Sequence, residues 1–191
     1  NISLSVHLGA QKAMYDSIAE IARRSGFIGG AGIVMDVQNG EVLVSVSNPE
    51  YDSNVLTDGK DVEKINGYLQ NKNNPFLDRV SSGLYTPGSI LKPIFALAAL
   101  VEGVISPEKQ IESTGELKVP NPYRPGEFTI FKDWKAHGYV DMRHAIAVSS
   151  DVYFYEVGGG YKDLKGLGIA RIEKYMKEFG FGQKIENSFF S

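Results

Sequence analysis

The sequence predicts an α+β domain in which helices pack on an antiparallel sheet, and three observations lead to this class. Two apolar, β-branched runs at residues 31–37 and 41–46 flank an Asn-Gly turn. Asn-Gly between such runs is the strongest short-range signal of a β-hairpin. Apolar residues at helical spacing predict an amphipathic helix over residues 10–24, ended by Gly26. A second, apolar helix is expected from Ser89 to Gly103.

The remaining elements follow from periodicity and turn residues. Leu4, Val6 and Leu8 alternate with polar residues and predict a short strand. Residues 47–74 are polar and loop-like, with one helical stretch near residues 62–69. Downstream of the apolar helix the pattern predicts strands at 116–119 and 127–131, a helix over 142–148 with Asp141 as its N-cap, a helix over 152–157, and a helix over 169–179 closed by Gly180.

Composition narrows the classes of partner and chemistry. The 191 residues suit one domain or part of a larger one. Lys and Arg number 20 against 23 Asp and Glu, with no run of like charge, so nucleic acid and membrane surfaces are excluded as primary partners. The absence of cysteine excludes disulfides and thiolate chemistry. His7, His137 and His144 lack ligand-like spacing, so we predict no metal and no cofactor.

Ser89 and Lys92 are the first candidate catalytic residues. Pro93 suits the first turn of a helix, and positions three apart share a helix face. A lysine in the first turn of an apolar helix opposes the helix dipole and is desolvated, and both effects favour a neutral amine that could take the proton of a Ser89 nucleophile. The alternative is a serine N-cap on a core helix with a lysine that reaches water. Ser106-Pro107-Glu108-Lys109 has the same spacing in a polar turn, so the pattern alone leaves both interpretations open.

Longer stretches around these residues resemble a known family. They are Tyr85-Thr86-Pro87-Gly88-Ser89-Ile90-Leu91-Lys92-Pro93, then Phe131-Lys132-Asp133-Trp134, then His137-Gly138-Tyr139-Val140-Asp141, and then Ser149-Ser150-Asp151-Val152-Tyr153-Phe154-Tyr155. In this order they resemble the class B penicillin-binding proteins, the peptidoglycan D,D-transpeptidases. Within that class they are most similar to the elongation-type penicillin-binding protein 2 group, whose second motif also carries Asp where relatives have Asn.

The resemblance implies a penicillin-binding/serine transpeptidase fold and a role for four residues. Ser89 would attack the carbonyl of a D-Ala-D-Ala stem peptide, and Lys92 would accept its proton. Ser149 would relay a proton to the leaving amine, and Asp151 would orient Lys92 or the substrate. The implied partners are peptidoglycan stem peptides, β-lactam antibiotics and a membrane glycan polymerase of the elongation machinery. The implied location is the extracytoplasmic face of the bacterial cell membrane, in the periplasm, with an anchor outside this chain.

One family feature is missing from the sequence. No Lys-Thr-Gly or Lys-Ser-Gly occurs, although in the family this third motif lies on a strand that contributes an oxyanion-hole amide. We therefore expect residues 1–191 to be a partial, N-terminal piece of the transpeptidase domain, without the third motif, the pedestal domain or the membrane anchor, and inactive alone. Two other functions stay open: a serine β-lactamase, and a non-catalytic sensor or scaffold that binds β-lactams or peptidoglycan.

Overall fold

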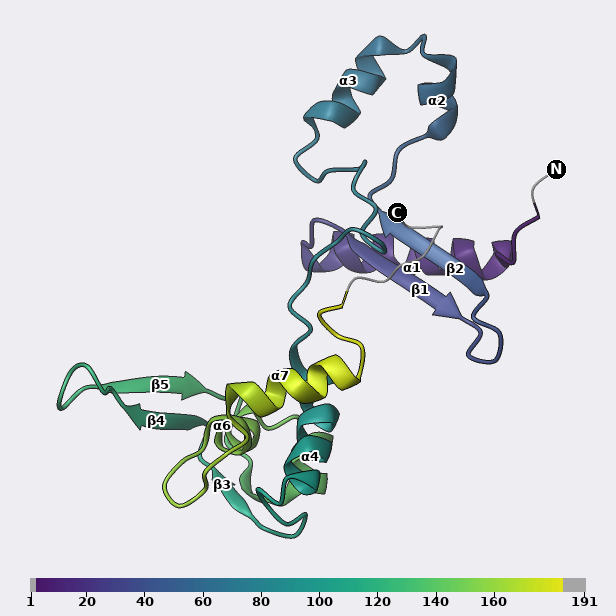
Figure 1. Ribbon diagram of the computed structural model, residues 1–191. Coiled ribbons are helices and arrows are strands. Elements are labelled where there is room, and N and C mark those ends of the chain that lie inside the picture. Colours follow the sequence, from purple (N-terminus) through teal and green to yellow (C-terminus); the bar gives the residue numbers. More distant parts are fainter. Residues whose placement is uncertain (1–2, 184–191) are drawn as a thin grey trace. The chain divides into compact units, whose positions relative to one another are not determined.

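The computed structural model describes residues 3–183, and the chain forms two compact units that divide between Tyr85 and Thr86 (Figure 1). Within each unit, helices accompany antiparallel strand pairs, which confirms the predicted α+β class. The prediction that residues 1–191 form a single partial domain stays a prediction.

The first unit begins with a helix on a hairpin. Helix α1 (Leu8–Ser25) packs against strands β1 (Gly30–Met35) and β2 (Val42–Asn48), which pair antiparallel with Gly30 opposite Asn48. Gly26, with a φ of 70°, ends α1 in the left-handed conformation that glycine adopts without strain. The predicted helix and hairpin are therefore confirmed, because both rest on signals local in the sequence.

The strand predicted at Leu4, Val6 and Leu8 is wrong. The His7 side chain accepts a hydrogen bond from the Ala10 N–H and caps α1, so Leu8 is already helical. The segment before it is tied to β2 by the His7 N–H, which donates to the Leu43 carbonyl. The polar stretch after β2 holds the predicted helix as α3 (Val62–Gln70) and a shorter one, α2 (Ser53–Asp58), that its brief pattern did not reveal.

The second unit contains the remaining elements. They are the 3₁₀ turn η1 (Gly88–Leu91), α4 (Lys92–Val101), β3 (Ile111–Ser113), β4 (Glu116–Pro120), β5 (Phe128–Lys132), β6 (Gly138–Val140), α5 (Met142–Ala147), α6 (Asp151–Gly159) and α7 (Gly168–Glu178). Strand β3 pairs antiparallel with β6, and β4 with β5. The predicted strand pair at 116–131 and the last three helices are confirmed, whereas the three-residue strands β3 and β6 were missed.

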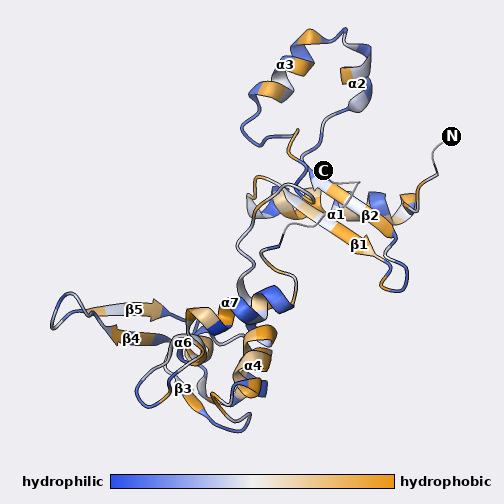
Figure 2. Ribbon diagram, in the orientation of Figure 1, coloured by the Kyte–Doolittle hydropathy of each residue, from blue (hydrophilic) through white to orange (hydrophobic). Residues whose placement is uncertain are grey.

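The core of the second unit lies where α4 meets the later helices. Ala98, Ala99 and Ala145 are fully buried together with Tyr153 and Val157 of α6. Small side chains let the helix backbones approach closely, which brings the start of α6 near the start of α4. After its first residues, α4 is hydrophobic as far as Val101 (Figure 2).

Although α4 is apolar, it is not buried on all sides, because Leu97 and Leu100 are 44% and 41% exposed. Across residues 3–183, no helix combines the length and the hydropathy that a membrane span requires.

Candidate active site

Lys92 brings together residues from two distant parts of the sequence. It opens α4, and its side chain is only 10% exposed. Its Nζ donates to the Ser149 carbonyl at 2.8 Å, to Ser149 Oγ at 3.0 Å and to Asp151 Oδ1 at 2.5 Å. Its amine also lies 5.7 Å from the centre of the Phe154 ring. Three of the four residues predicted for the site are therefore in direct contact.

Ser149 occupies an unusual backbone position between α5 and α6. Its φ is 55°, in the left-handed region that residues other than glycine rarely adopt. In this conformation both its carbonyl and its hydroxyl oxygen lie within hydrogen-bond distance of the same amine. Strain of this kind persists where surrounding contacts hold it in place, and it clusters at functional sites.

Ser89, the predicted nucleophile, is exposed in η1, one helical turn before Lys92. No hydrogen bond joins its hydroxyl to Lys92 in the part of the chain that the structure describes. A lysine ammonium has three N–H donors, and each already has an acceptor among Ser149 and Asp151. The Nζ of Lys92 is thus directed at Ser149 and the Asp151 carboxylate rather than at the Ser89 hydroxyl. The neutral amine expected from helix position and burial stays a prediction.

A fifth residue, Asp133, holds the other side of the α5–α6 junction. Its side chain has no exposed surface. Its Oδ2 accepts from Ser150 Oγ at 3.0 Å and from the Val152 N–H at 3.0 Å. Burial alone raises the pKa of Asp133, but the N–H groups of Val152 and Trp134 and the Ser150 hydroxyl outweigh it, so the pKa lies below its ordinary 3.8. Sequence reasoning missed this role, because no spacing rule marks one aspartate as the centre of contacts 17 to 20 residues away.

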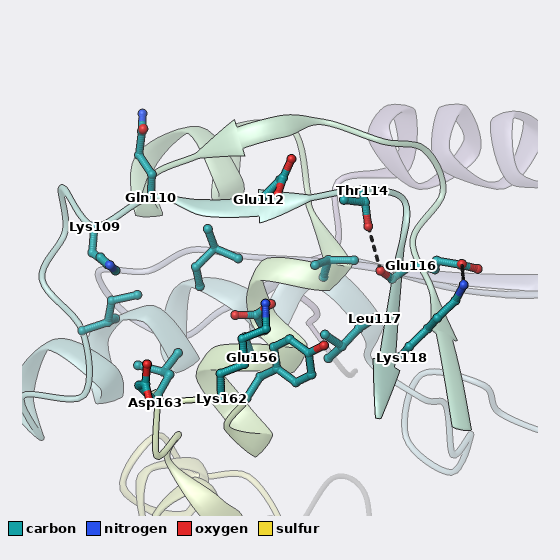
Figure 3. Close-up of a pocket in the computed structure, with 15 residues that line it drawn as sticks. Lys109, Gln110, Glu112, Thr114, Glu116, Leu117, Lys118, Glu156, Lys162 and Asp163 are labelled. Carbon is teal, nitrogen blue, oxygen red and sulfur yellow. Dashed lines mark hydrogen bonds and ion pairs between the residues drawn. The ribbon is translucent and has the colours of Figure 1, made fainter. Parts of the chain in front are cut away.

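A polar pocket lies elsewhere in the second unit (Figure 3). It has a volume of about 510 Å³ and is lined by β3, β4, α6 and the segment 161–164. Charged side chains such as Glu112, Glu156 and Lys162 line it, and none of the four predicted site residues does. Burial raises the pKa of Glu156, against the opposing charge of Lys162. Among residues 3–183, no group of three or more His, Cys, Asp or Glu side chains is placed to hold a metal ion.

The sequence matches a known domain family over most of its length. The model of the penicillin binding protein transpeptidase domain matches residues 30–190. The peptidoglycan D,D-transpeptidase MrdA of Haemophilus influenzae is 38% identical over 180 residues, which are 93% of this chain and 26% of the relative. MrdA of Escherichia coli K12 is 32% identical over 154 residues, 80% of this chain and 23% of the relative. The chain thus spans about a quarter of the length of these relatives.

Solved structures agree with this match. Pseudomonas aeruginosa PBP2 in complex with WCK 5153 is similar with a TM-score of 0.70 and 30% identity, over 95% of this chain and 38% of that one. Helicobacter pylori PBP2 in complex with MreC has a TM-score of 0.68 and 32% identity, over 86% of this chain and 30% of that one. The chain therefore belongs to the penicillin-binding protein transpeptidase family, and the relatives described above are named peptidoglycan D,D-transpeptidase MrdA or PBP2.

Proposed function

We propose that the complete protein containing this chain is a peptidoglycan D,D-transpeptidase that works through an acyl-enzyme on Ser89. The observation that carries the proposal is the Lys92 amine, which opens the helix following Ser89 and contacts both Ser149 and Asp151. A nucleophile next to a basic group that is itself oriented by a third group is the usual arrangement for covalent catalysis. The relatives named D,D-transpeptidase support the same reaction.

In the proposed reaction, Ser89 Oγ attacks the carbonyl carbon of the D-Ala-D-Ala peptide bond. The hydroxyl proton passes to Lys92, and the bond to the terminal D-Ala breaks. The leaving amine takes a proton through the Ser149 hydroxyl, which contacts Lys92, so that free D-Ala departs and an ester on Ser89 remains. The amine of a second stem peptide then attacks this ester, which forms the cross-link and returns the proton to Ser89. A β-lactam would acylate Ser89 by ring opening in place of the first step.

The contacts that the Lys92 amine already makes limit how it could act as a base. Lys92 can accept the Ser89 proton only as a neutral amine, which has two N–H donors and a lone pair, whereas three oxygen atoms surround its Nζ. One of these three contacts must therefore be lost, or be made by the Ser149 hydroxyl donating to Nζ. The Asp151 carboxylate, at 2.5 Å, is the charged partner that holds the amine at the site meanwhile. Substrate binding beside Ser149 is the step that we expect to loosen this arrangement.

We further propose that the complete protein works on the extracytoplasmic side of the bacterial cell membrane, anchored by a segment outside this chain. Its substrates, the peptidoglycan stem peptides, are located there. A membrane glycan polymerase is the proposed partner, because cross-linking by this chemistry needs newly made glycan strands. The Helicobacter pylori relative solved in complex with MreC supports an assembly with other proteins.

The first experiment incubates the complete protein with a fluorescent penicillin. We expect one label per molecule on the peptide that contains Ser89, slow release of that label, and no labelling of Ser89→Ala. Ser106→Ala is the matched control, because Ser106 begins the second Ser-x-x-Lys sequence in an exposed turn. This variant should be labelled like the wild type.

The same experiment separates the alternatives. Rapid release of the label would favour a β-lactamase. If neither penicillin nor a stem peptide ever acylates Ser89, the sensor or scaffold function gains and transpeptidation is refuted. Formation of a cross-linked dimer from stem peptides, dependent on Ser89, would complete the case for the transpeptidase.

A further inference from the structure

The junction between α5 and α6 comprises residues 148–152. Successive residues of the junction contact Lys92 and the segment 133–134 in turn. Ser149 and Asp151 contact Lys92. Their neighbours Val148, Ser150 and Val152 contact instead the segment 133–134 that follows β5. The junction is thus clamped between α4 and this segment.

The contacts on the second side centre on Asp133. Its Oδ2 accepts from Ser150 Oγ and from the Val152 N–H, both at 3.0 Å. The adjacent Trp134 donates its indole N–H to the Val148 carbonyl at 3.2 Å. Segment 133–134 therefore fixes the carbonyl of Val148, the hydroxyl of Ser150 and the backbone N–H of Val152.

Asp133 is itself held rigidly in place. Its backbone N–H donates to the Gly115 carbonyl at 2.9 Å, and Ser113 Oγ donates to its Oδ2 at 3.2 Å. Its Oδ1 accepts from the Trp134 N–H at 2.8 Å and lies 3.4 Å from His137 Nε2. The His137 and Asp133 side chains are 2% and 0% exposed, so water does not compete for these contacts.

We propose that Asp133 is a positioning residue for the acyl-transfer site, which holds Ser149 in its left-handed conformation and Asp151 against Lys92. This inference rests on the proposed function for its kinetic consequence. The physical reason is that a serine at φ 55° is strained, so its geometry needs contacts on both flanking residues to persist. Asp133 provides the contact on Ser150, and the adjacent Trp134 provides the one on Val148. Asp133 also binds the Val152 N–H, so it holds both neighbours of Asp151.

The test compares Asp133→Asn with wild type in the complete protein. Asparagine keeps the size of the side chain but lacks the second carboxylate oxygen, so it cannot accept all the bonds that Asp133 accepts. We expect the rate constant of acylation by penicillin to fall ~10- to 100-fold, the cost of misplacing a catalytic group by about an ångström. The dissociation constant of the non-covalent penicillin complex should change little.

The matched control is Tyr175→Phe, which removes the hydrogen bond from α7 to Glu102 in the same unit but leaves the junction alone. A merely structural role for Asp133 predicts that both variants lose acylation in proportion to their loss of thermal stability. Positioning predicts that only Asp133→Asn is slowed. Equal rates in Asp133→Asn and wild type, or losses that follow stability in both variants, would overturn the proposal.

A second readout does not depend on acylation. Because the Val152 N–H donates to Asp133, its hydrogen exchange should speed up in Asp133→Asn, and the carboxyl carbon resonance of Asp151 should shift as its contact with Lys92 changes. Tyr175→Phe should alter neither. If wild type is never acylated, the proposed function fails, but the resonance still tests the positioning role. An unchanged Asp151 resonance in Asp133→Asn refutes that role, and a shift supports it.

Should Asp133→Asn fail to fold, Ser150→Ala and Trp134→Phe each remove a single contact with the junction. Each should slow acylation more than Tyr175→Phe does at equal loss of stability. If neither does so, the proposal is wrong.

Discussion

Lys92 is surrounded by acceptors that come from one short junction. As an ammonium it has three N–H donors, and Ser149 and Asp151 accept from all of them. The Lys92 side chain is 10% exposed and that of Asp151 is 32% exposed, so water screens the pair in part and its net contribution to stability is small. The pair is therefore better understood as fixing the position of the amine than as a source of stability.

Asp133 should give folding a dependence on acid pH. Hydrogen bonds to its carboxylate hold the pKa below the ordinary 3.8, although burial alone would raise it, and His137 is the titratable group that faces it. A carboxyl with a lowered pKa in the folded state stabilises the fold above its unfolded pKa, and this contribution is lost as pH falls through the folded value. We expect wild type to lose stability as pH falls below about 4.

Asp133→Asn has no such proton to bind, so its loss over the same window should be smaller. Thermal melts of both proteins between neutral pH and pH 3 measure the difference, with Ser113→Ala as the control that keeps the carboxyl. Parallel curves for wild type and Asp133→Asn would contradict the assignment.

At the scale of elements, the sequence predicted what local signals determine. The Asn-Gly turn between β1 and β2, the Gly26 end of α1 and the Asp141 cap of α5 each act within a few residues, and the structure shows all of them. Strands β3 and β6 have three residues each and exist because they pair with one another across 25 to 29 positions, which no local pattern indicates.

Part of the candidate site could likewise be predicted from the sequence, and part of it could not. The Ser-x-x-Lys spacing pointed to Ser89 and Lys92, and the resemblance to the family pointed to Ser149 and Asp151. Lys92, Ser149 and Asp151 are in contact. The left-handed φ of Ser149 and the contacts of Asp133 depend on residues distant in sequence, so they could be found only from the fold.

Packing of α1 on the hairpin depends on a glycine. A Cβ on Gly32 would lie 2.1 Å from Met14 Sδ and 3.2 Å from Ile18 Cδ1. We expect Gly32→Ala to destabilise the first unit by about 1–3 kcal/mol, the usual cost of overpacking a fitted interface. Chemical denaturation measures the change.

The double variant Gly32→Ala with Met14→Ala provides the control, because it removes the side chain that the new methyl group meets. It should be more stable than the sum of the two single variants predicts. Simple additivity would show that the methyl group is accommodated by other movements and that the close approach is not what selects glycine.

At the scale of the whole molecule, the proposed reaction needs groups that form an acyl-enzyme and groups that stabilise its transition state. Ser89 and Lys92 are present, whereas no Lys-Thr-Gly or Lys-Ser-Gly sequence is. Among residues 3–183 each sheet has two strands. The resemblance to the family implies that the third motif lies on a further strand. In acyl transfer by a serine, two N–H donors bind the developing oxyanion, and loss of one costs ~10²–10³ in rate.

We therefore expect the isolated 191 residues to react with penicillin at Ser89 about 10²–10³ times more slowly than the complete protein, and to form no cross-links. Labelling both proteins side by side with fluorescent penicillin measures the ratio. Slow hydrogen exchange at the Val152 amide would show that the isolated chain has folded at the site, so that its low rate reflects the missing donor rather than unfolding. Recovery of the rate on adding a separate chain that carries the third motif would locate the deficit in that strand, and an equal rate in both proteins would mean that this chain alone completes the oxyanion site.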